Sequence, residues 1–228
     1  MASGEEAQIM GAVRTQDMSV SWVSGPGIRN ENTDRICILT MANGQIRLTM
    51  QSSTINLKGM RLTKGHICVF ALFEAYGDGE KDAAAADKAS EVFINTVMKY
   101  DITKKPAAGV IRKCLSKADK AVKKESGDSK YKASVAAFAA KDLTACSVNG
   151  GRMFILSDDG KMKEFRAEGM DIMSVGTSWK NVMMVSGGFP ASSDDAEDDM
   201  RSPIGDIITK KGMKELPNPS SMIRAQKI

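Results

Sequence analysis

The sequence predicts an α+β fold in which two antiparallel β-sheets pack together as a central β-sandwich with helices outside. The first and last parts of the chain contain short runs rich in Val, Ile and Thr that are bounded by Gly, Asn and Ser, a pattern typical of antiparallel strands. Between these parts lie two stretches with apolar residues at helical spacing. We expect a single domain over residues 1–228, because this length suffices for one core and no low-complexity linker divides the chain.

The strands of the first part are expected between residues 12 and 60, as the runs SVSWV, ICILTM, QIRLTM and STINL. Asn43-Gly44 lies between the second and third runs and is expected to form a hairpin turn, because both residues tolerate positive φ. The next run, VFALF, is apolar throughout and indicates a buried strand. It breaks abruptly into Glu, Ala, Tyr and Gly, so we expect its end to lie at a cleft.

Two helices are expected at about residues 82–100 and 106–124. In the first, Ala86, Phe93 and Val97 belong to an apolar stripe, which is more typical of packing on a sheet than of a ligand site. Pro106 suits the first turn of the second helix.

Strands resume after the helices, with runs expected at residues 132–140, 144–149, 152–156 and 161–165. We expect these runs to form a meander with a turn at residues 158–160. The rest of the chain predicts a strand at 181–188, an acidic loop at 194–199, a short helix near 203–211 and a last strand near 221–226.

Positive charge is concentrated between Lys104 and Lys132, where ten Lys or Arg residues occur with three Asp or Glu residues. Nucleic acid is one partner to consider for such a run. The lysines mostly follow the outer face of the second expected helix, and no aromatic residues interleave them as stacking on bases requires. The pattern therefore favours a solvated helix face over a nucleic-acid site.

The four cysteines are widely spaced, lie in apolar surroundings and form no C-x-x-C pair, which argues against zinc and against a disulfide framework. The first ten residues contain acids where a signal or transit peptide carries positive charge, and no stretch approaches 18 apolar residues. We therefore expect a soluble, cytoplasmic protein that does not associate with membranes.

The strand and turn VFALFEAYGDG resemble a motif of the metal-dependent serine/threonine protein phosphatases of the type 2C family, F-A-V-F-D-G-H-G. Glu74 stands at the Asp position, Ala75 at the first Gly and Tyr76 at the His, while Gly77 matches. The order of elements also resembles this family over nearly the whole chain, which implies a helix pair on each outer face of the sandwich. The segment between residues 156 and 181 is much shorter than in the family, which implies that a helical flap beside the cleft is almost absent.

The family's R-x-x-N-E-D motif resembles residues 29–34, in which Arg29, Asn32 and Asp34 match and Thr33 replaces a Glu. In the family the Arg binds phosphate and the acids hold a pair of metal ions. Alternatively, Arg29 and Asp34 pair with each other or cap a turn.

Three further positions of the family pattern lack their acid. Gly150 stands at the Asp of N-x-G-D-S-R, whose Arg is matched by Arg152. Gly187 stands at the central Asp of an S-D-G motif, and Ser220 at the Asp of D-N-x-T.

Asp34 and Glu74 are thus the only remaining candidates for metal ligands among the expected acids. The family's reaction depends on two divalent cations that lower the pKa of a bridging water from about 15.7 toward 7, and these cations need several oxygen ligands. The resemblance with these substitutions predicts a pseudophosphatase without catalytic residues or cofactor. Its expected role is that of a protein-binding scaffold or a regulatory or structural subunit.

Two alternatives stay open. Arg29 could grip the phosphate of a phosphopeptide without turnover, or Asp34 and Glu74 could support weak phosphatase activity with one Mn²⁺ or Mg²⁺. A Ser/His/Asp or Cys/His mechanism would have to use His66, the only histidine, which opens an apolar strand and is expected to be a strand-end residue. The partner is not identified by the sequence, and a cytoskeletal or axonemal array is one version of the binding hypothesis.

Overall fold

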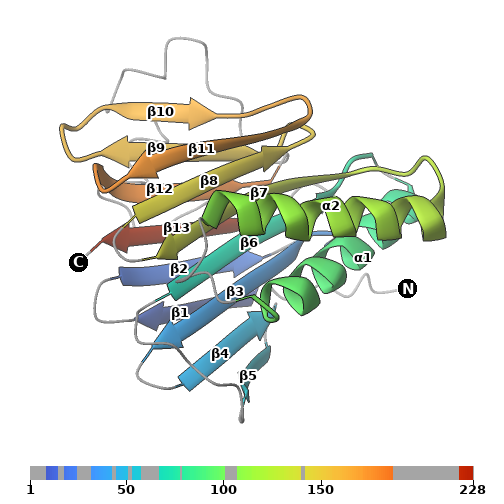
Figure 1. Cartoon of the computed structure of the whole chain (residues 1–228), viewed down its shortest axis with the longest axis horizontal. Helices are drawn as coiled ribbons and strands as arrows, with labels where there is room; N and C mark the ends of the chain where they lie inside the picture. The colour runs from blue at the N-terminus through green and yellow to red at the C-terminus, as the bar shows by residue number, and fades with distance from the viewer. Residues whose placement is uncertain are drawn as a thin grey trace, which may run out of the picture.

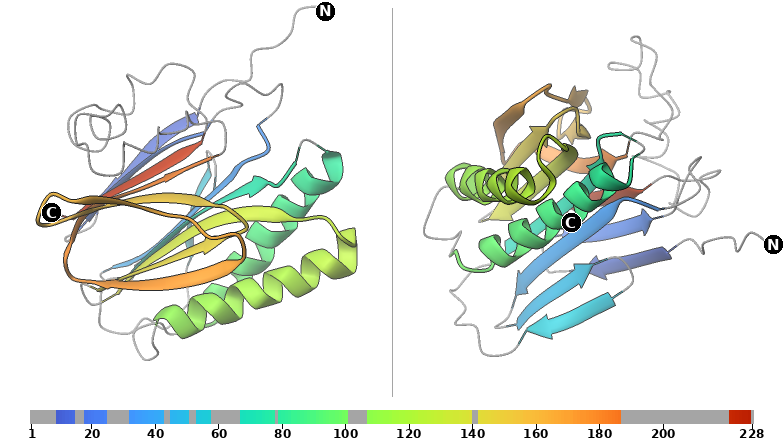
Figure 2. Two further views of the ribbon diagram at one scale, coloured as in Figure 1. Left: turned by 90° about the horizontal axis from the view of Figure 1, so that it is seen from above. Right: turned by 90° about the vertical axis from the view of Figure 1, so that its right-hand side faces the viewer.

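The computed structural model describes residues 9–14, 18–24, 32–42, 45–50, 53–57, 67–77, 79–100, 107–139, 142–186 and 221–227. In this part of the chain two antiparallel sheets lie face to face, and two helices cover the outer face of one sheet (Figure 1). The two views in Figure 2 show three layers in succession: the helices, the sheet that they cover, and the opposite sheet. The expected α+β architecture is confirmed.

The seven-stranded sheet has the order β11-β8-β7-β6-β3-β4-β5. Its strands are β3 (Arg35–Ala42), β4 (Gln45–Met50), β5 (Ser53–Leu57), β6 (Ile67–Ala75), β7 (Tyr131–Ala139), β8 (Asp142–Val148) and β11 (Met170–Gly176). In the β3–β4 pair Ala42 lies opposite Gln45, as a two-residue hairpin requires. The Asn43-Gly44 turn itself lies outside the described residues.

The six-stranded sheet has the order β1-β2-β13-β12-β9-β10. Its strands are β1 (Ile9–Arg14), β2 (Met18–Ser24), β9 (Arg152–Ser157), β10 (Met162–Phe165), β12 (Trp179–Val185) and β13 (Met222–Lys227). The expected turn at residues 158–160 joins β9 to β10, and Gly160 supplies its positive φ of 87°.

The expected four-strand meander is wrong, because β8 and β9 belong to different sheets. β7 pairs with β8 in one sheet, and β9 pairs with β10 in the other. Asn149 and Gly150, with φ of 50° and 89°, redirect the chain between the sheets. β11, which has no strand signature in the sequence, occupies the place beside β8.

The helices are α1 (Glu80–Val97) and α2 (Ala107–Ser126), close to their expected bounds. Both contribute to a core cluster with residues of the seven-stranded sheet. The expected helix at residues 203–211 lies outside the described part of the chain, so a helix pair on the six-stranded sheet stays a prediction. Neither α1 nor α2 combines the length and the hydropathy that a transmembrane helix needs.

Strand β6 lies in the middle layer of the fold and is buried on both faces. Cys68, Phe70 and Leu72 point into the core between the sheets. The alternate residues Val69 and Phe73 point toward the helices. Because successive side chains of a strand face opposite sides, burial on both faces explains why this run is apolar throughout.

All four cysteines are buried and none forms a disulfide bond. Burial raises the pKa of each of the thiols of Cys37, Cys68, Cys114 and Cys146 to about 12. These thiols are therefore protonated at neutral pH and serve as small apolar core side chains.

Candidate functional site

The segments that carry the motifs meet at one end of the sandwich, which we call the motif end. It comprises residues 32–34 before β3, 74–76 at the end of β6, the 149–151 turn, and Ser24, Ser186 and Ser221. The register of the sheets places them together, since Arg35 pairs with Phe73 in one sheet and Met222 with Val23 in the other.

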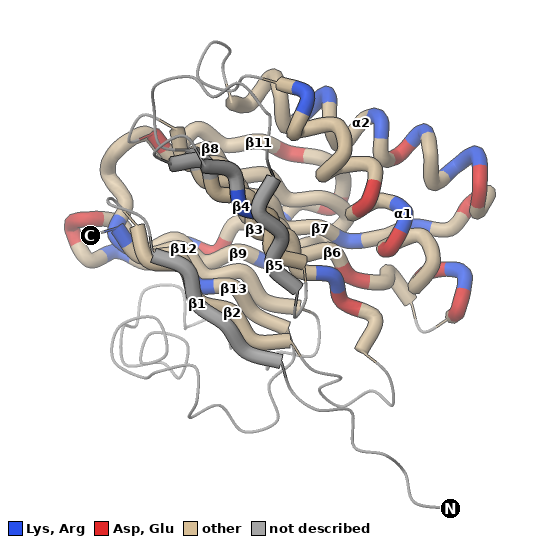
Figure 3. The backbone as a smooth tube through the Cα atoms, turned by 90° about the horizontal axis from the view of Figure 1, so that it is seen from below, with Lys and Arg blue, Asp and Glu red and all other residues tan. Residues whose placement is uncertain are grey.

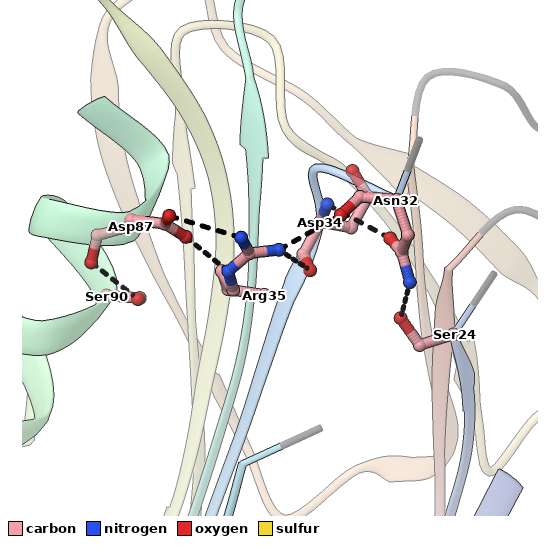
Figure 4. Close-up of polar contacts among 6 residues, drawn as sticks. All are labelled: Ser24, Asn32, Asp34, Arg35, Asp87 and Ser90. Carbon is pink, nitrogen blue, oxygen red and sulfur yellow. Dashed lines mark hydrogen bonds and ion pairs between the residues drawn. The ribbon is translucent and has the colours of Figure 1, made fainter. Parts of the chain in front are cut away.

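Asn32 links the two sheets at this end (Figure 4). Its side-chain amide donates to Ser24 Oγ at 2.9 Å, and its Oδ1 accepts the N–H of Asp34 at 3.1 Å. Ser24 Oγ in turn lies 3.0 Å from Ser221 Oγ of the neighbouring segment. The Asn of the sequence motif therefore stabilises an Asx-type turn and joins β3 to the opposite sheet.

Arg35, which is not part of the motif pattern in the sequence, fixes the same turn to helix α1 (Figure 4). Its guanidinium donates to the carbonyl oxygens of Asn32 and Asp34 at 3.1 and 3.0 Å. It also forms an ion pair with Asp87. The only signal in the sequence was the position of Arg35 directly after the motif. Arg29, the expected phosphate ligand, lies outside the described residues, so both interpretations of it remain predictions.

The two candidate carboxylates, Asp34 and Glu74, are both buried, with 6% and 3% of their surface exposed. Both lie at the motif end: Asp34 directly precedes β3, and Glu74 lies near the end of the neighbouring strand β6. Thr33, at the position of the family's Glu, is half-buried.

The turn after β6 presents a different chemistry from the one that the family motif implies. Ala75 is buried and pairs with Tyr131 of β7. Tyr76, at the His position, is 48% exposed. The ammonium groups of Lys130 and Lys132 lie 5.6 and 5.7 Å from its ring centroid. The side chain at the His position is thus held at the surface by two cation–π contacts.

The 149–151 turn is fixed by the backbone around it. Asn149 Nδ2 donates to the carbonyl oxygen of Tyr131 at 2.8 Å. The N–H of Gly150 donates to the carbonyl oxygen of Ala167 at 2.6 Å. Gly150 has a φ of 89°, a conformation that is strained for any side chain. The conformation of this position therefore suits the glycine that is present better than the aspartate of the family pattern.

Arg152, which matches the family motif, has structural partners. Its Nε donates to Glu164 Oε1 at 2.8 Å, and its guanidinium lies 5.3 Å from the ring centroid of Phe154. The pair ties β9 to β10. In the motifs that contain Gly187 and Ser220, the structure describes the neighbouring residues Ser186 and Ser221. The N–H of Ser186 donates to the carbonyl oxygen of Ser221 at 2.9 Å. Gly187 and Ser220 lie outside the described residues.

The residues at the motif end do not fit a pair of divalent cations. Magnesium and manganese need oxygen ligands, chiefly carboxylates, to offset their dehydration. Thr33, Gly150, Gly187 and Ser220 stand where the resemblance places acids or metal-associated residues. Within the described ranges, no group of three or more His, Cys, Asp and Glu residues is arranged to hold a metal ion.

Comparison with known proteins identifies the fold. No protein-family model matches the sequence, and no curated protein matches it. Among solved structures, RsbX in complex with magnesium has a TM-score of 0.60 at 13% identity, over 96% of this chain and 100% of RsbX. PppA of Pseudomonas aeruginosa has a TM-score of 0.57 at 13% identity, over 97% of this chain and 100% of PppA.

The serine/threonine phosphatase PstP of Mycobacterium tuberculosis has a TM-score of 0.55 at 11% identity, over 92% of this chain and 98% of PstP. A structure of the catalytic domain of PstP contains two manganese ions. Each of these matches extends over almost the full length of both proteins. The chain therefore has the fold of the metal-dependent type 2C serine/threonine phosphatases.

Proposed function

We propose that this chain is a catalytically inactive phosphatase-like domain that binds other proteins, as a scaffold or as a regulatory or structural subunit of a larger complex. The observation that carries the proposal is the replacement of the metal-binding acids by Thr33, Gly150, Gly187 and Ser220 within a phosphatase fold. The reaction needs a water activated by two metal ions and a clamp on the phosphoryl group. Two carboxylates alone, Asp34 and Glu74, do not provide a preorganised site for such a pair.

The arrangement of the motif end supports the same proposal. Asn32 and Arg152, which match the phosphatase motifs, hold Ser24 and Glu164 and so serve the structure of the sandwich. Tyr76 replaces an imidazole with a phenol that lies between two lysines at the surface. Clusters of buried apolar side chains lie on both faces of β6. Because the fold is retained while the metal-binding acids are replaced, we infer that the outer surfaces of the domain bind partner proteins. We further propose that this binding takes place in the cytoplasm.

An aryl-phosphate hydrolysis assay with Mn²⁺ tests the proposal. The purified chain is expected to show no manganese-dependent rate above that of its Asp34→Ala variant, because the metal pair that generates the nucleophile is not held. An active type 2C phosphatase assayed in parallel serves as the positive control. Manganese-dependent turnover that is lost in both Asp34→Ala and Glu74→Ala would show that a residual enzyme remains, and the proposal would be wrong.

A further inference from the structure

Lys and Arg residues recur along α2 (Figure 3), and six of them that are exposed to solvent form a positively charged side of the helix. We call it the α2 basic face and define it by its exposed cations, Arg112, Lys113, Lys117, Lys120, Lys123 and Lys124. The opposite side of the helix is apolar and packs into the core. Helix α2 is therefore amphipathic: its apolar side packs into the core, and its charged side faces solvent or a partner.

Two pairs of these cations have a spacing that weakens the helix. Lys113 and Lys117, and Lys120 and Lys124, are four residues apart, where like charges repel and weaken a helix. None of the six cations forms an ion pair with a carboxylate in the part of the chain that the structure describes. The acids of α2 have other partners, since Asp119 accepts the Tyr131 hydroxyl at 2.6 Å and Glu125 lies 3.0 Å from Lys88 of α1.

A cavity of about 240 Å³ adjoins the C-terminal half of this face. Its apolar lining includes Val122, Val148 and Met170. Lys123, which belongs to the α2 basic face, and Lys130, which contacts Tyr76, also line it. The cavity has room for one side chain rather than for a drug-sized ligand. The cavity therefore lies at one end of the α2 basic face.

We propose that the α2 basic face and this cavity bind an acidic segment of a partner protein. Carboxylates of the segment would lie along the helix, and one apolar side chain would enter the cavity between Val122, Val148 and Met170. The positive charge of the α2 basic face favours an acidic partner, and the apolar lining of the cavity favours an apolar side chain as the anchor of the segment. The proposal rests on the protein-binding role proposed above and names the surface and the chemistry that serve it.

A protein segment fits this surface better than a nucleic acid. Binding of single strands uses exposed aromatic rings on which bases stack. Among the described residues, the one exposed large apolar or aromatic side chain is Tyr76, which lies beyond the cavity and is flanked by Lys130 and Lys132. The ring of Tyr100 lies under Lys113 of the α2 basic face, with its centroid 5.2 Å from the ammonium group. The helix thus offers charge without stacking sites.

Fluorescence anisotropy with the full chain tests the proposal. The probe is a dye-labelled peptide of repeated Glu-Glu-Leu triplets, and a Gln-Gln-Leu peptide is its uncharged control. We expect the acidic peptide to bind, with an affinity that falls when salt is raised from about 0.1 M to about 1 M, because the Debye length shortens from about 10 Å to about 3 Å. The double variant Lys120→Glu/Lys123→Glu is expected to weaken binding roughly tenfold or more.

A matched control places the same charge change elsewhere on the surface. Lys161→Glu/Lys163→Glu alters two exposed lysines at the β9–β10 hairpin and is expected to change the affinity less than about twofold. Ser129→Trp, which introduces a bulky side chain into the lining of the cavity, is expected to weaken binding without any change of charge. Circular dichroism confirms that each variant is folded.

Three results would overturn this assignment: no binding of the acidic peptide by the wild-type chain, equal losses in the two double variants, or equally tight binding of an oligonucleotide of the same charge. Unchanged binding by Ser129→Trp would remove the cavity from the site. Phosphate hydrolysis by the chain would refute its proposed inactivity and leave these peptide results unaffected. The two proposals can therefore fail separately.

Discussion

The Gly151→Ala substitution is expected to destabilise the fold by about 3 kcal/mol. Gly151 lies where the chain passes from β8 to β9, directly against β7. A Cβ at this position would overlap the backbone carbonyl of Ala133 and lie 3.0 Å from the N of Ser134. Because the obstacle is backbone within a paired strand, it cannot move aside without breaking the β6–β7–β8 ladder. Urea unfolding measures the effect as a lower midpoint.

Gly109→Ala provides the control for this experiment. Gly109 is exposed in α2, and a Cβ there meets nothing within 4 Å. Alanine at a helical position is expected to stabilise the chain by about 0.5–1 kcal/mol relative to glycine. If Gly151→Ala unfolds at the same urea concentration as the wild type, the turn does not pass close to β7 as described. The described path of the chain from one sheet to the other would then also be wrong.

The Phe73→Ala substitution is expected to cost about 3–5 kcal/mol. Phe73 is fully buried at the end of β6, with its ring centroid 5.5 Å from that of Phe93 in α1 and 5.8 Å from that of Tyr131 in β7. Alanine would leave a cavity where a strand, a helix and a second strand meet. The free energy of unfolding, measured by urea titration, reports the loss.

Tyr76→Ala is the matched control, three residues further along the same strand and turn. Its ring is about half exposed and has two cation–π contacts, so truncation is expected to change stability by roughly 0.5–1 kcal/mol. Similar costs for the two substitutions would contradict the described position of Phe73 in the core.

Most elements of this fold could be predicted because each has a local signature. The helical spacing of apolar residues defined α1 and α2, and the apolar run of β6 indicated burial. β11 has no such signature, because it is an edge strand in which no residue is fully buried. The assignment of β8 and β9 to different sheets also depends on long-range packing, which a local pattern does not contain.

The candidate site was predicted in part for a similar reason. The family motifs identify Asp34, Glu74 and Gly150 as candidate site positions, and the structure places all three at one end of the sandwich. The contacts of Asn32 with Ser24 and of Arg35 with Asp87 connect residues on separate elements. Such pairs depend on how the elements pack in three dimensions, so the motif residues alone do not indicate them.

A count of bound manganese ions tests the central claim most directly. Titration of the full chain with Mn²⁺, followed by electron paramagnetic resonance of the free ion, gives the number of ions bound per chain. The account predicts at most one weakly bound ion, which is lost in the Asp34→Asn/Glu74→Gln variant, because only two of the expected acids remain. Two tightly bound ions per chain would contradict it.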